Sequence, residues 1–95
     1  MPGGSRVEVF TSRNCPRCRL LKSFLESRGL EFVERRIDED PEAEVDALML
    51  NIFEVPALVV RGSDGARVLT ASEMFGPFLE LRREVVEEWL EKCLR

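Results

Sequence analysis

The sequence predicts an α/β domain in which helices flank a central mixed sheet of four strands. Segments typical of strands and helices follow one another in the order β-α-β-α-β-β-α. The chain has 95 residues, about the size of one compact domain, so we expect a single domain over residues 1–95. Apolar residues make up 44% of the chain and charged residues 34%, a composition typical of a globular domain with a buried core.

The first half of the chain contains a strand, a helix and a second strand. Residues 6–10 alternate polar and apolar side chains, as in a strand that is buried on one face. A polar loop over residues 11–14 leads to Pro16, which suits the first turn of a helix, and apolar residues then recur at helical spacing. Residues 32–37 are rich in β-forming residues and predict the second strand, with the pair Arg35–Arg36 at a solvated strand end.

A second helix is expected to begin at Asp40, whose carboxylate can cap it, with Pro41 at its first position. Its apolar residues are spaced i, i+3, i+4, i+7 and i+8, which predicts that they share the face toward the core. These residues are Val45, Leu48, Met49, Ile52 and Phe53.

The last part of the chain predicts a hairpin and a final helix. Residues 57–60 are continuously apolar, as expected of a strand covered on both faces. Turn residues at 62–65 and a return strand over 66–70 complete the hairpin. After Gly76–Pro77 a helix is expected over residues 78–94. One side of it can be apolar, formed by Phe78, Val85, Val86, Trp89, Leu90 and Cys93. Two β-α-β crossovers followed by this hairpin would give a mixed sheet.

Charge and missing residue types exclude several functions. The net charge of −4 gives no general attraction to nucleic acid or to anionic lipid, and no apolar run is long enough to span a membrane. We therefore expect neither a nucleic-acid partner nor a membrane partner. The first six residues are followed by no hydrophobic segment, so we expect no secretory signal and a cytoplasmic location. The chain has no His, which excludes Ser-His and Cys-His catalysis.

Cys15 and Cys18 are the residues best placed for chemistry. They lie where the polar loop meets the first helix, and the unpaired N–H groups of a helix start favour a thiolate over a thiol. Arg13, Arg17 and Arg19 add positive charge around the pair. The spacing places the second thiol one turn behind the first, within range of a disulfide. We expect Cys15 to attack a substrate disulfide and Cys18 to resolve the mixed disulfide.

Other interpretations of the cysteine pair remain open. A CxxC pair can supply half of a metal site or part of an iron–sulfur cluster shared between two chains. Because the chain has no His and only Cys93 as a further thiol, we assign no metal ligands. The pair could instead be buried as two small apolar residues, which would make the chain a redox-inert interaction module. We expect Cys93 itself in the core, because it shares an apolar helical face with Trp89.

The motif Cys15-Pro16-Arg17-Cys18 at a helix start, with Val55–Pro56 opening a buried strand, resembles the thioredoxin superfamily and most of all its glutaredoxin-like branch. The resemblance extends from about residue 6 to residue 94 and implies a thioredoxin-like fold and a dithiol–disulfide oxidoreductase. It implies that Pro56 is a cis proline opposite the cysteines and that Val55 offers its backbone to a bound substrate. The expected substrate-binding residues are Arg13, Pro16, Arg17, Val55 and Pro56.

The sequence also departs from both branches of the superfamily. Arg17 stands where glutaredoxins carry an aromatic residue, and residues 74–78 have a single glycine and a proline where glutaredoxins tend to have the Gly-Gly pair that holds glutathione. Asn14 replaces the tryptophan that precedes the motif in thioredoxins, and no buried acidic residue is evident on the first strand.

The resemblance implies no cofactor besides the redox-active disulfide, with glutathione as the one candidate ligand. It implies a disulfide-containing protein or a small thiol as substrate, a reductase or glutathione as electron donor, and a monomer.

Overall fold

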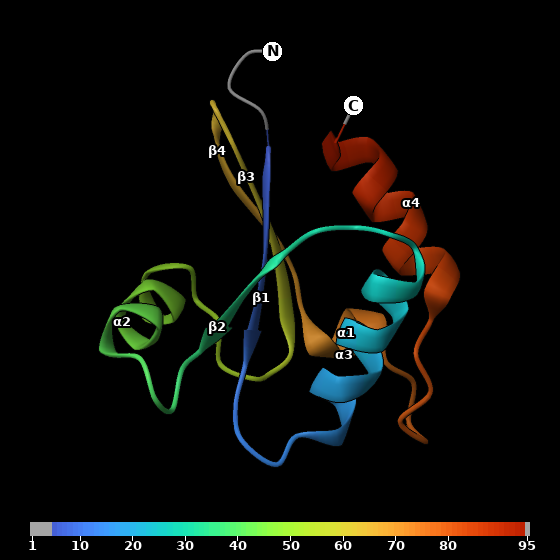
Figure 1. Ribbon diagram of the computed structural model, residues 1–95, viewed down its shortest axis with the longest axis horizontal. Helices are drawn as coiled ribbons and strands as arrows, with labels where there is room; N and C mark the ends of the chain where they lie inside the picture. Colours follow the sequence, from blue (N-terminus) through green and yellow to red (C-terminus); the bar gives the residue numbers. More distant parts are fainter. Residues whose placement is uncertain (1–4, 95) are drawn as a thin grey trace.

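Residues 5–94, the part of the chain that the computed structural model describes, form a four-stranded sheet and four helices (Figure 1). Along the chain these elements are β1 (Arg6–Thr11), α1 (Pro16–Ser27), β2 (Val33–Arg36), α2 (Pro41–Met49), β3 (Ala57–Gly62), β4 (Gly65–Leu69), α3 (Ala71–Met74) and α4 (Arg83–Leu94). The predicted order is confirmed, with the short helix α3 added before the last helix. None of these helices, within the described residues, is long and apolar enough to cross a bilayer.

The sheet is mixed, as predicted, with the strand order β2-β1-β3-β4. β1 runs parallel to β2 and antiparallel to β3, which is antiparallel to β4. The expectation of a second β-α-β crossover is therefore wrong, because β3 runs opposite to β2. As a result β1 and β2 end, and β3 begins, at the same end of the sheet.

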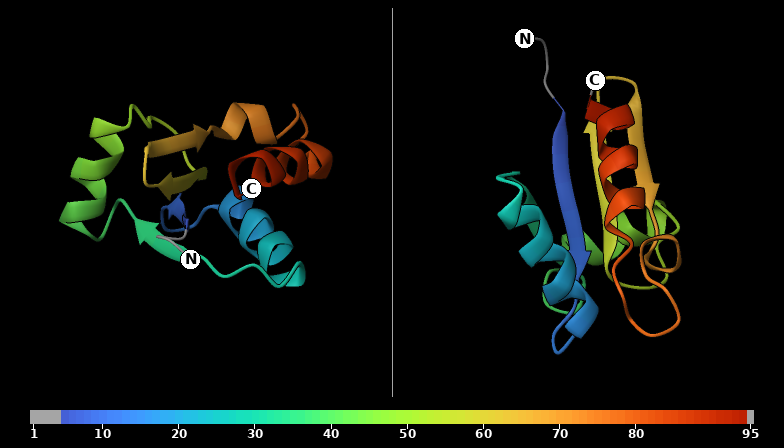
Figure 2. Two further views of the ribbon diagram at one scale, coloured as in Figure 1. Left: turned by 90° about the horizontal axis from the view of Figure 1, so that it is seen from above. Right: turned by 90° about the vertical axis from the view of Figure 1, so that its right-hand side faces the viewer.

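Helices cover both faces of the sheet, with α1, α3 and α4 on one face and α2 on the other (Figure 2). Alternation along β1 sends Val7 and Val9 into the core beneath α1 and α4, and Phe10 into a smaller core beneath α2. Leu58 of β3 joins the first core and Val59 the second, as expected for a strand buried on both faces.

The predicted inward face of α2 is wrong at four of its five positions. Ile52 is buried, but the other four side chains are 59% to 80% exposed: Val45, Leu48, Met49 and Phe53. The buried residues of the helix are Ala43 and Ala47, whose small side chains let it lie close to the sheet. Asp46 lies between them along the chain and accepts hydrogen bonds from Arg35 and Arg61, which holds this side of α2 toward the strands.

The final helix begins five residues later than predicted, at Arg83. Residues 75–82 form a loop in which Leu79 has a φ of +66° and its N–H donates to the carbonyl of Gly76. Phe78, which lies in this loop, is 87% exposed instead of packed. Val86 is buried, and Trp89, Leu90 and Cys93 pack against the main core from α4, as predicted, whereas Val85, predicted on the same side, is exposed.

A group of charged side chains, which we call the ion cluster, lies on the α2 face of the sheet. Glu8 of β1 is only 1% exposed and pairs with the guanidinium groups of Arg6, Arg35 and Arg61 at 3.0 to 3.1 Å. Asp46 of α2 pairs with the last two arginines and completes the cluster. Arg35 is thus largely buried, so its predicted place at a solvated strand end is wrong. Glu8 is also a buried acidic residue on the first strand, which the sequence did not reveal.

Candidate active site

The two cysteines of the motif differ in exposure and in role within α1. Cys15 is the N-cap of the helix and is half-buried, while Cys18 in the first turn is 2% exposed. The two side chains form a disulfide, with their Cα atoms 5.2 Å apart. The backbone N–H of Cys18 donates a hydrogen bond of 3.1 Å to the sulfur of Cys15. An N–H directed at this sulfur favours its thiolate once the disulfide is reduced, so the more accessible cysteine is also the one that the helix start stabilises as an anion.

The position of α1 follows from its sequence. Pro16 occupies the first turn, where its missing N–H costs no helical hydrogen bond, and Leu21 and Leu25 bury the inner face. Glu34 of β2 accepts hydrogen bonds from Lys22 of α1 and from Thr11 at the end of β1. Partial burial acts to raise the pKa of Glu34, but these two hydrogen bonds prevail and lower it. The helix that carries the thiols is therefore held to the sheet by packing and by charge.

Arg17 connects the motif to the segment before β3. Its guanidinium Nη2 donates a hydrogen bond of 3.0 Å to the carbonyl of Val55, and the guanidinium carbon lies 5.8 Å from the centre of the Phe75 ring. The Val55–Pro56 bond is cis, which confirms the prediction made from the resemblance. Arg17 and Val55 are thus brought together, as predicted for two residues of one site. Their binding of substrate stays a prediction.

Arg13 points to a different partner. Its backbone N–H donates to Asp38, and its guanidinium pairs with Glu39 in the turn after β2. The hydrogen bond and the charge of Glu39 raise the pKa of Arg13, and the same hydrogen bond lowers the pKa of Glu39. The charge of Arg13 is therefore already matched within the chain, and its predicted contact with substrate also stays a prediction.

Sequence reasoning did not assign two residues of this region. Phe75 is buried beneath the guanidinium of Arg17, and its only signal in the sequence is its place just before the Gly76–Pro77 break. Glu39, one of three successive acidic residues before α2, pairs with Arg13. The signal in the sequence for this pair is the opposite charge of Arg13 and Glu39, which follow the ends of the neighbouring strands β1 and β2.

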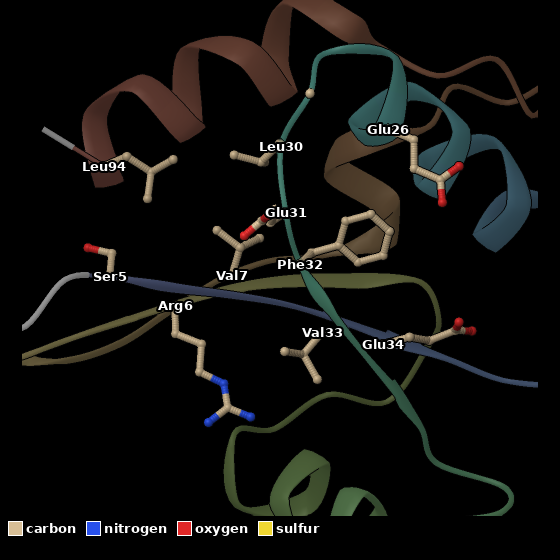
Figure 3. A pocket seen from close by; sticks show the side chains of 11 residues that line it. Ser5, Arg6, Val7, Glu26, Leu30, Glu31, Phe32, Val33, Glu34 and Leu94 are labelled. Atoms are coloured by element: carbon tan, nitrogen blue, oxygen red, sulfur yellow. The ribbon is translucent and has the colours of Figure 1, made fainter.

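A hollow of about 1030 Å³ lies away from the thiols (Figure 3). It is lined by the start of β1, including Arg6 and Val7, and by residues 29–34, whereas Cys15 follows the end of β1. No predicted site residue lines it. Among residues 5–94 we find no group of three or more His, Cys, Asp or Glu side chains that is arranged to hold a metal ion.

Comparisons with known proteins agree with this geometry. A family model described as Glutaredoxin matches residues 7–64, which include both cysteines and Val55–Pro56. No match is found among curated proteins.

Similar solved structures are thioredoxins or thioredoxin-like proteins. The thioredoxin-like protein BC3987 is 21% identical, with a TM-score of 0.66 over 87% of this chain and 97% of its own. Thioredoxin of Fasciola hepatica is 18% identical, with a TM-score of 0.69 over 96% of this chain and 82% of its own. Thioredoxin f of spinach chloroplasts is 13% identical, with a TM-score of 0.71 over 96% of this chain and 77% of its own. At these identities the likeness establishes a thioredoxin-like fold.

Proposed function

Because the chain belongs to the glutaredoxin family, whose members are generally thiol–disulfide oxidoreductases, we propose that it reduces disulfides with Cys15 as nucleophile and Cys18 as resolving thiol. The observation that carries the proposal is the asymmetry of the pair. Cys15 is half-buried and its sulfur accepts a hydrogen bond from an N–H at the start of α1, while Cys18 is buried. An attacking thiol needs access and a stabilised thiolate, whereas a resolving thiol needs only to reach the first sulfur.

The reaction proceeds by two exchanges. The Cys15 thiolate attacks one sulfur of the substrate disulfide, so that a mixed disulfide forms and the other substrate sulfur leaves as a thiolate. The Cys18 thiolate then attacks the sulfur of Cys15, which releases the second substrate thiolate and leaves the Cys15–Cys18 disulfide seen here. The substrate has gained two electrons and the protein has lost two. Two electrons from an external thiol donor restore the dithiol.

The proposal includes the surroundings of the reaction. The substrate is a disulfide-containing protein or a small-molecule disulfide, and the electron donor is glutathione or a reductase. The chain acts as a single domain and as a monomer in the cytoplasm, without a metal or other cofactor. The segment over residues 74–78 has few free N–H donors for a glutathione carboxylate, because Pro77 has none and Gly76 N–H already donates to the carbonyl of Glu80.

Two serine variants test the proposal. In an assay of protein-disulfide reduction, Cys15→Ser is expected to abolish turnover. Cys18→Ser is expected to accumulate mixed disulfides on Cys15, detected by mass spectrometry. Cys93→Ser is the matched control and is expected to leave the rate unchanged, because this thiol packs against the core from α4. Full activity in the Cys15 variant, or stoichiometric zinc or iron in the purified protein, would overturn the assignment.

A further inference from the structure

Arg17 is the charged residue of the motif Cys15-Pro16-Arg17-Cys18, and its guanidinium has no acidic partner among residues 5–94. Six of the eleven arginines among residues 5–94, at positions 6, 13, 28, 35, 36 and 61, form a salt bridge with a glutamate or aspartate, whereas those at positions 17, 19, 67, 82 and 83 form none. Arg17 forms none, although Glu54 directly precedes the residue to which it is bonded. Its single hydrogen bond, to the Val55 carbonyl, uses one of the five N–H donors of a guanidinium.

The guanidinium is nevertheless held in place. The Val55 carbonyl fixes it from the β3 side, and the ring of Phe75, which is itself buried, lies beneath it. A charged group that is already ordered loses little conformational entropy when it binds a ligand, so its ion pairs are stronger than those of a free surface arginine. Arg17 also lies between the two cysteines in sequence, in the first turn of the helix that carries both thiols.

We propose that Arg17 is a specificity residue that binds a carboxylate located next to the reacting cysteine of the substrate, so that peptide disulfides with acidic neighbours are reduced preferentially. This inference rests on the proposed function and names its substrate class. Carboxylates match the paired N–H groups of a guanidinium and form charge-assisted hydrogen bonds with it. The net charge of the chain is −4, so the overall field gives acidic substrates no advantage and the preference has to arise at the site itself.

The test uses three disulfide peptides that differ only in the residue beside the cysteine, which is Asp, Asn or Lys. For the unmodified chain we expect kcat/KM for the Asp peptide to exceed that for the Asn peptide about tenfold, and the Lys peptide to be slowest. In Arg17→Gln the ratio of kcat/KM between the Asp and Asn peptides is expected to fall to about one. Arg17→Lys keeps the charge without the paired donors and is expected to retain part of the preference.

A charge-matched control separates local binding from overall charge. Arg67 of β4 is exposed and lies outside the motif, so Arg67→Gln changes the net charge equally and is expected to keep the preference. A preference that survives in Arg17→Gln, one that is absent in the unmodified chain, or an equal loss of rate for all three peptides in Arg17→Gln would each overturn the inference. The ratio of kcat/KM between oxidised glutathione and its carboxyl ester, measured in the unmodified chain and in Arg17→Gln, shows whether Arg17 also binds the carboxylate of a small molecule.

A second measurement does not depend on turnover. Cys18→Ser is incubated with an equal mixture of the Asp and Asn peptide disulfides, and the mixed disulfides on Cys15 are counted by mass spectrometry. The Asp adduct is expected to predominate in Cys18→Ser and to lose this advantage when Arg17→Gln is added; equal adducts in Cys18→Ser would contradict the inference. If these adducts form on Cys18→Ser but the unmodified chain turns over no peptide, the proposed function is wrong. The ratio of the Asp and Asn adducts still shows whether Arg17 favours a carboxylate.

Discussion

The two faces of the sheet are buried by different means. Toward α1, α3 and α4 the buried side chains are mainly large and apolar, such as Leu21 and Leu58. Toward α2 the helix contributes only Ala43 and Ala47 to the apolar core, and the buried carboxylate of Glu8 occupies the sheet beside them. The first face is held mainly by the hydrophobic effect, whereas the second depends on charges that are matched away from water.

This difference matters for the site because its two segments adjoin, along the chain, elements that pack on opposite faces of the sheet. The thiols lie on α1, which packs on the apolar face through Leu21 and Leu25. Val55–Pro56 follows α2, which the ion cluster holds to the sheet through Asp46. The contact between Arg17 and Val55 therefore joins a helix that is held by apolar packing to a segment that follows a helix held by ion pairs.

Removing the buried carboxylate of the ion cluster is expected to have the largest effect on stability. Glu8→Ala leaves three arginines without this partner and is expected to lower the free energy of unfolding by about 3–5 kcal/mol. Urea denaturation followed by circular dichroism measures this value. Glu8→Gln keeps the shape of the side chain and one hydrogen-bond acceptor but removes the charge. It therefore separates the contribution of the charge from that of packing and hydrogen bonding. A loss below about 1 kcal/mol for Glu8→Ala would show that the α2 face does not depend on the cluster.

A cavity in the apolar face is expected to have a similar or smaller effect. Leu58→Ala removes a fully buried side chain between α1 and α4 and is expected to cost about 2–5 kcal/mol in the same assay. Leu20→Ala, on the exposed side of α1, is the matched control and is expected to cost less than about 0.5 kcal/mol. Equal losses for both variants would contradict the assignment of this face as the main apolar core.

The smallest expected effect is a pH dependence that arises from Asp46. Partial burial acts to raise the pKa of this carboxyl, but the hydrogen bonds and charges of Arg35 and Arg61 prevail and lower it. Because the folded chain holds the ionised form more strongly than the unfolded chain does, the contribution of Asp46 is present above about pH 4 and is lost as the pH falls further.

Asp46→Asn is expected to be less stable than the unmodified chain at pH 7, with the difference shrinking below about pH 4. Denaturant titrations at several pH values measure this difference in the free energy of unfolding. Both chains keep Glu8, Arg35 and Arg61. Glu88→Gln, on the exposed side of α4, serves as the control. A difference between Asp46→Asn and the unmodified chain that stays constant down to pH 2 would rule out this origin.

The apolar face and the thiol motif could be predicted from the sequence because their signals are local. Pro16 at a helix start, helical spacing up to Leu25 and the apolar run from Ala57 each indicate one element without knowledge of the rest. The cis bond before Pro56 followed from the resemblance carried by the motif. In these segments local preference and tertiary packing favour the same structure.

The α2 face could not be predicted in the same way. Two faces of α2 satisfy helical spacing, and the larger side chains, including Met49, favour the wrong one. The correct orientation depends on Asp46 reaching Arg35 and Arg61, which are distant in sequence. In the same way, alternation along β1 assigns Glu8 to the solvent-exposed side. Its burial is favourable because Arg35 and Arg61 of the neighbouring strands, together with Arg6, pair with it.

The position of Glu8 also determines how the strands align. It is bonded to Arg35 on one neighbouring strand and to Arg61 on the other, so a single carboxylate spans three adjacent strands. If β1 slipped by one residue, its side chains would exchange faces, and this carboxylate would enter the apolar layer without a counter-ion. The ionic contacts thus penalise misaligned pairings, and they fix the position along the sheet at which β1 ends and leads into the loop that carries Cys15.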